Sequence, residues 1–118
     1  QAYWAGDDST KTIHVHVDFV QTGRNLVLRT PCVPQDNCRL YGLTQTGRDQ
    51  LGIPNASVID LESGSGTLSG PGITFTVRAV DGRVYSFTGT VLESKLILGK
   101  FSGGMFPAPY SLRLDKQP

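Results

Sequence analysis

The chain has 118 residues and a formal net charge of +1, which suits one domain and excludes a protein that works as a polycation on nucleic acid or anionic lipid. No apolar run approaches the roughly 20 residues that a membrane-spanning helix needs. Val, Ile and Thr number 26 against 11 for Ala, Glu and Lys, and 14 glycines favour turns. The composition predicts an all-β domain.

The predicted elements begin with a polar N-terminal arm over residues 1–11, which leaves residues 12–118 as a single β domain. In its first half, strands are expected where apolar side chains alternate between turn-forming residues. Residues 44–54 have no clean period, so we expect a long loop with room for one helical turn. A glycine-serine connection is expected over residues 64–72. The expected first-half strands cover residues 12–20, 25–29, 39–43 and 58–61.

The first of these strands carries the sharpest chemical pattern in the chain. With its apolar side chains on one face, its other face would present His14, His16 and Asp18. Two imidazoles and a carboxylate on one face could approach a single cation. A solvated outer face explains the same pattern, and we take that interpretation first, with the metal site as the alternative.

Cys32 and Cys38 are six positions apart in a segment rich in proline and other turn formers. A short loop of this kind can bring two Cα atoms within disulfide distance. We therefore predict a disulfide that contributes roughly 2 kcal/mol. Since disulfides persist in oxidising compartments, it also predicts a secreted or periplasmic location. Free thiols in a reducing compartment are the alternative.

The second half allows strand pairing to be predicted residue by residue. A three-residue turn at its first hairpin places Phe75 opposite Phe87, whereas a two-residue turn would pair side chains from opposite faces. The same reasoning at the next hairpin pairs Phe87 with Phe101 and Gly89 with Gly99. An aromatic face would therefore border a spot that has no side chains.

About eight short strands, the last over residues 110–114, favour an antiparallel up-and-down meander closed into a small barrel. A two-sheet β-sandwich is the alternative. Residues 87–91 and 98–103 place a glycine beside apolar residues on successive strands, and in this they resemble the calycin-type barrels, the lipocalin and avidin-like secreted binding proteins. The resemblance implies a barrel that binds another molecule, and it transfers no binding residue to this chain.

The spot beside Gly89 and Gly99 is the first candidate binding site. With walls made by Phe75, Phe87 and Phe101 it could be an apolar ligand slot, because ligand pockets are mostly apolar. Packing of these rings in the core is the alternative, since glycines also make room for bulky neighbours.

A loop rich in glycine and proline before the last strand is the second candidate site. It displays Met105, Phe106 and Tyr110, which suit contact with a ligand or a partner protein. The alternative is a plug that folds inward and caps the core.

No catalytic motif stands out. The nine serines lack a G-x-S-x-G elbow, and Gly99-Lys100 is followed by Phe101, so the phosphate-binding pattern is absent. We predict a non-enzymatic binding protein without a cofactor, which carries a small apolar ligand in the barrel. The alternative is a protein-interaction module, an inhibitor or a surface-complex subunit, that binds through its loops. Neither nucleic acid nor a transmembrane segment is expected.

Overall fold

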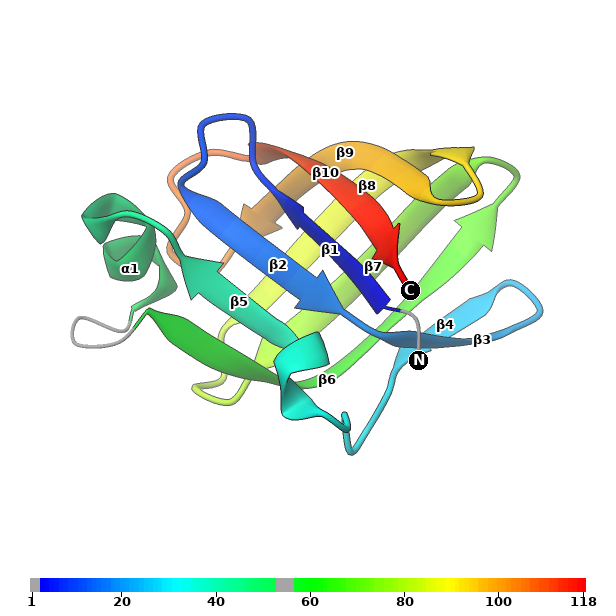
Figure 1. Cartoon of the computed structure of the whole chain (residues 1–118), viewed down its shortest axis with the longest axis horizontal. Coiled ribbons are helices and arrows are strands. Elements are labelled where there is room, and N and C mark those ends of the chain that lie inside the picture. The colour runs from blue at the N-terminus through cyan, green and yellow to red at the C-terminus, as the bar shows by residue number, and fades with distance from the viewer. Residues whose placement is uncertain (1–2, 53–56) are drawn as a thin grey trace.

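The computed structural model describes residues 3–52 and 57–118. Eight of its antiparallel strands, β1, β2, β5, β6, β7, β8, β9 and β10, form a ring in sequence order that closes between β10 and β1. A hairpin, β3–β4, is inserted between β2 and β5 and pairs with the far half of β6 (Figure 1). The strands are β1 (Tyr3–Asp7), β2 (Ile13–Val17), β3 (Phe19–Thr22), β4 (Asn25–Leu28), β5 (Arg39–Gly42), β6 (Val58–Ser69), β7 (Gly72–Ala79), β8 (Val84–Glu93), β9 (Leu96–Gly103) and β10 (Tyr110–Gln117).

The closed ring confirms the predicted all-β meander barrel and excludes the two-sheet sandwich. Strand pairing in the second half follows the predicted register. Phe75 lies opposite Phe87, and Gly89 lies opposite Gly99. The turn between β7 and β8 has three residues and ends at Gly82, whose φ of 93° is a conformation that glycine adopts readily.

The predicted polar arm over residues 1–11 is corrected by β1, which pairs with both β2 and β10. Its inward positions are Trp4, which packs against the core, and Gly6. Because only one of these two side chains is large and apolar, the segment lacks the alternation that marks a half-buried strand. Pairing with β2 and β10 stabilises this strand, although its own side chains do not alternate between apolar and polar.

The predicted glycine-serine connection over residues 64–72 is also corrected, because β6 continues to Ser69. Gly64 and Gly66 take inward positions where the strands approach closely. A Cβ atom added at Gly66 would lie 2.6 Å from Cβ of Phe75. Gly66 makes room for Phe75 and Gly64 for Val77, and neither glycine ends the strand.

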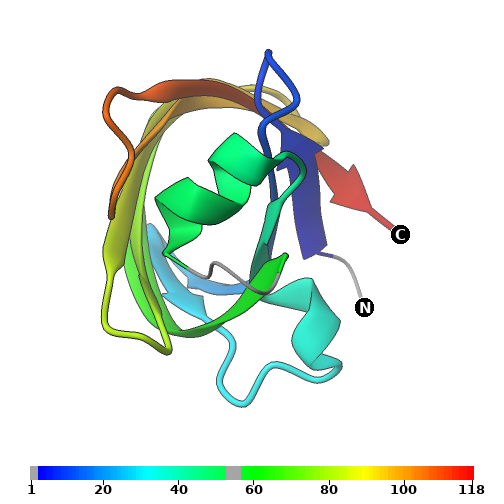
Figure 2. The same ribbon diagram turned by 90° about the vertical axis from the view of Figure 1, so that its left-hand side faces the viewer.

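One end of the barrel is covered by a helix, α1 (Gln45–Leu51), where a loop with at most one helical turn was expected. The Thr44 hydroxyl accepts a hydrogen bond from the Gly47 N–H at 3.0 Å, and Gly52 ends the helix with a φ of 74°. Leu51, the last residue of the helix, is fully buried. Figure 2 looks onto this end, with α1 lying across the opening of the barrel.

The predicted disulfide joins Cys32 to Cys38, with Cα atoms 6.2 Å apart and both residues buried. A short 3-10 helix, η1 (Gln35–Asn37), forms within the loop that it closes. Neither helix found in the described ranges has the length and apolar character needed to cross a bilayer.

Candidate functional site

The hollow predicted beside Gly89 and Gly99 is filled by the core itself. A Cβ atom added at Gly99 would lie 2.6 Å from Cζ of Phe87 and 2.4 Å from the backbone oxygen of Thr88. Phe87 is buried and stacks on Phe75, with ring centroids 4.8 Å apart. The two glycines therefore accommodate an aromatic ring, and the structure corrects the predicted ligand slot to core packing.

The predicted binding loop before β10 folds back onto the barrel. The Phe106 ring is half-buried, with its centroid 5.8 Å from that of Phe101 and 5.0 Å from that of Tyr110. The Tyr110 hydroxyl donates a hydrogen bond to Gln50 of α1. Met105 remains 51% exposed. The loop thus acts as a plug that closes the helix-covered end together with α1.

The opposite end of the barrel is hollow. Arg83, next to the β7–β8 turn, donates to the Leu51 carbonyl at 3.4 Å, which places α1 at that end of the strands. A cavity of about 490 Å³ opens at the other end, beside the β6–β7 and β8–β9 turns. The β3–β4 hairpin extends from this end of the barrel (Figure 1). Phe75 is the member of the predicted site that lines this cavity, whose apolar lining also includes Trp4, Val17, Leu26, Leu68, Val91 and Ile97.

Sequence reasoning placed several of these side chains correctly without finding the cavity. The predicted register that pairs Phe87 with Phe101 also sets Val91 opposite Ile97, as the structure has them. The missing signal is the β3–β4 hairpin, which adds Phe19 and Leu26 to the lining from outside the ring of eight strands. Alternation along single strands carries no information about where such a hairpin lies.

The lining of this cavity also includes polar groups. Asp18, between β2 and β3, is 2% exposed and its carboxylate accepts a hydrogen bond from Nε of Arg29 at 3.0 Å. The Arg29 N–H also donates to the Asp18 carbonyl at 2.8 Å. Gln21, Ser94 and Lys116 are the other polar residues of the lining. An apolar cavity with a few polar groups in its lining suits a small, mostly apolar ligand.

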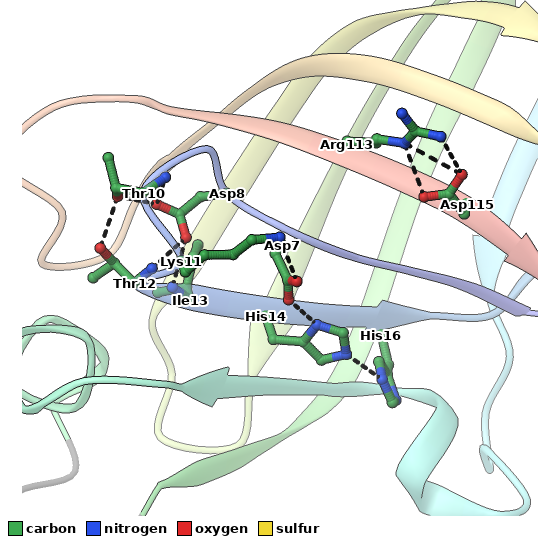
Figure 3. Close-up of polar contacts among 10 residues, drawn as sticks. All are labelled: Asp7, Asp8, Thr10, Lys11, Thr12, Ile13, His14, His16, Arg113 and Asp115. Atoms are coloured by element: carbon green, nitrogen blue, oxygen red, sulfur yellow. Dashed lines mark hydrogen bonds and ion pairs between the residues drawn. The ribbon is translucent and has the colours of Figure 1, made fainter.

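Asp18 does not belong with His14 and His16 as a candidate metal ligand, because the strand is interrupted at this residue. The sequence placed Asp18 on the same face as His14 and His16, but the chain bends between β2 and β3 and turns its side chain into the barrel. The two histidines stay on the outer wall (Figure 3). Nowhere in the ranges 3–52 and 57–118 do three or more His, Cys, Asp or Glu side chains gather to hold a metal ion.

On the outer wall, the two imidazoles face each other, with Nε2 of His14 2.6 Å from Nε2 of His16. Nδ1 of His14 bonds to the Asp7 carboxylate, and Nδ1 of His16 lies 2.7 Å from the Asp36 carbonyl oxygen. Burial opposes ionisation of Asp7, but hydrogen bonds from His14 and Lys11 outweigh it and lower the pKa of Asp7. Burial lowers the pKa of His16, against the raising effect of its hydrogen bond to Asp36.

No family model and no curated protein matches the chain. The geometry of the barrel and of its two polar clusters is therefore what indicates a function.

Proposed function

We propose that this chain is a non-enzymatic binding protein that carries a small apolar ligand in the cavity at the β3–β4 end of the barrel. The observation that carries the proposal is the asymmetry of the two ends. One end is closed by α1 and Phe106, and the other opens into about 490 Å³ lined by apolar side chains. That volume lies within the range of small-molecule pockets, roughly 300–1,000 Å³.

A ligand in this cavity would have an apolar body and a polar end. Its body would rest among the inward side chains of β6 to β9, and its polar end would lie near Arg29 and Lys116. The carboxylate in the lining, that of Asp18, is engaged in an ion pair with Arg29, which supports binding rather than acid–base chemistry.

The resemblance to calycin-type barrels agrees with this proposal, since eight antiparallel strands closed in sequence order can hold one small ligand. The Cys32–Cys38 disulfide supports an extracytoplasmic location. A protein-interaction module has less support, because Phe106 packs inward and Met105 is left as the large exposed hydrophobic side chain of its loop.

The test uses N-phenyl-1-naphthylamine, a neutral apolar fluorophore, with Trp4 as the internal reporter. Trp4 is the single tryptophan of the chain and lines the cavity. Binding there should be saturable, raise the probe's emission and quench Trp4 by energy transfer.

Two neighbouring positions on β8 provide a variant and its control. Val91→Arg places a charge in the cavity and should weaken probe binding roughly tenfold or more, because burying a charge is costly. Leu92→Arg changes a side chain that is 54% exposed on the outer face and should leave binding unchanged. Equal probe affinity in the two folded variants, or no saturable binding to the unmodified protein, would refute the proposal.

A further inference from the structure

The outer wall of the barrel holds a second, chemically different cluster. His14 and His16 are two positions apart on β2, so both side chains lie on the same face of the strand. Their ring centroids are 4.6 Å apart in an edge-on arrangement. Tyr3 on β1 and Tyr41 on β5 flank the His16 ring at 5.1 and 4.9 Å between centroids and hold it in place.

The position of His14 is set by the turn between β1 and β2. The Asp8 carboxylate, 1% exposed, accepts hydrogen bonds from the backbone N–H groups of Thr12 at 2.6 Å and Ile13 at 2.8 Å (Figure 3). This turn fixes the register in which Asp7 lies directly opposite His14. The contact between these two side chains is therefore built into the hairpin.

Both Nδ1 atoms act as donors. The Asp36 carbonyl oxygen can only accept, so Nδ1 of His16 carries a hydrogen. The Asp7 carboxylate likewise accepts from Nδ1 of His14. In the neutral tautomers both lone pairs then lie on the Nε2 atoms, which face each other. Two facing lone pairs repel unless a cation, either a proton or a metal ion, lies between them.

This arrangement matches the surroundings of metal-binding histidines, which donate their second ring N–H to a carboxylate or a backbone carbonyl. Here the partner of His14 is the Asp7 carboxylate, and the partner of His16 is the Asp36 carbonyl oxygen. Two nitrogens that each lie about 2.0–2.1 Å from one ion stand roughly 3 Å apart. Since the two Nε2 atoms are 2.6 Å apart, a small swing of either ring suffices to admit the ion.

We propose that His14 and His16 bind one divalent transition-metal ion through their Nε2 atoms, Cu²⁺ more tightly than Zn²⁺. The preference follows the general order of stability for nitrogen ligands. Thiolate does not compete in this chain, because both cysteines are in the disulfide. Water fills the remaining coordination positions, so the ion stays open to an external donor. Asp7 is a positioning residue that orients the ring of His14.

The test is calorimetric titration of the metal-free protein with CuCl₂ and ZnCl₂, together with electron paramagnetic resonance of the copper-loaded sample. We expect one ion per chain, tighter binding of Cu²⁺, and hyperfine structure from two nitrogens. His16→Ala should weaken Cu²⁺ binding about 100-fold, and Asp7→Asn roughly 10-fold to 100-fold. Asp115→Asn, which removes an exposed carboxylate on β10, should bind Cu²⁺ as the unmodified protein does.

Proton NMR of the unmodified protein makes the result independent of the folding of any variant. Substoichiometric Cu²⁺ should broaden the ring signals of both histidines and leave the Tyr85 ring signals sharp. Broadening of one histidine alone, the absence of a 1:1 endpoint, or an unchanged affinity in His16→Ala would overturn the proposal. Because the site lies on the outer wall, probe binding in the cavity does not depend on it.

Discussion

Tyr85 is fully buried, and its hydroxyl has no hydrogen-bond partner among the residues that the structure describes. Its ring stacks on Phe101 at 5.7 Å and lies 5.2 Å from Phe106. An unpaired buried hydroxyl costs about 1–3 kcal/mol. Tyr85→Phe keeps the ring and removes this cost. We therefore expect the free energy of unfolding at pH 8 to rise by roughly 1 kcal/mol, whereas most core substitutions lower it.

The same hydroxyl makes stability depend on alkaline pH. Burial raises the pKa of Tyr85 from its ordinary value of 10.0 to about 12, with a further rise from nearby Asp81. Below pH 10 the phenol is protonated in both the folded and the unfolded chain. Between pH 10 and 12 only the unfolded chain loses the proton readily, so the folded state becomes less stable as the pH rises.

The magnitude at pH 11 is about 1.4 kcal/mol, because that pH lies one unit above the unfolded pKa and one below the folded pKa. Urea denaturation of the unmodified protein and of Tyr85→Phe at pH 8 and pH 11 measures it. Contributions from the other titrating groups are common to both proteins, and they cancel in the difference. A variant destabilised at pH 8, or a difference that does not change with pH, would show that the buried Tyr85 hydroxyl does not destabilise the fold.

Further predictions concern close contacts and the cross-link. Gly99→Ala should lower the free energy of unfolding by about 1–3 kcal/mol, because its Cβ would lie 2.4 Å from a backbone oxygen; an unchanged urea midpoint would contradict this. Gly47→Ala should destabilise α1, because its Cβ would lie 2.2 Å from the Thr12 carbonyl oxygen. We expect faster hydrogen exchange of the α1 amides, and an unchanged exchange rate would contradict this. Replacing Cys32 and Cys38 by serine should lower the free energy of unfolding by about 2 kcal/mol, as measured by thermal denaturation. An unchanged midpoint would mean that cross-linking so short a loop does not stabilise the fold.

Strand pairing in the second half could be predicted because two constraints act together. Alternation tells which face each side chain takes, and a hairpin turn of known length then leaves a single register, such as Phe75 with Phe87. β1 and the second half of β6 escape this reasoning, since their inward positions include Gly6, Gly64 and Gly66. Such strands are stabilised by neighbouring strands, which only the folded chain brings together.

The candidate sites were harder to predict for a related reason. Strict alternation would place Asp18 outside the barrel, but a bend of one residue between β2 and β3 turns it inward to meet Arg29. A shift of one residue reverses every face assignment that follows it. The helix α1 was missed because Gly47 reads as a helix breaker, whereas its missing side chain is what allows the helix to pack against the turn before β2.

Intermolecular nuclear Overhauser effects between bound N-phenyl-1-naphthylamine and the protein test the proposed binding cavity most directly. We expect contacts from the probe to the Trp4 indole and to the methyl groups of Leu68 and Val91, all of which line the cavity at the β3–β4 end. Contacts to Met105 or Phe106 at the helix-covered end, or no contacts at saturating probe, would contradict it.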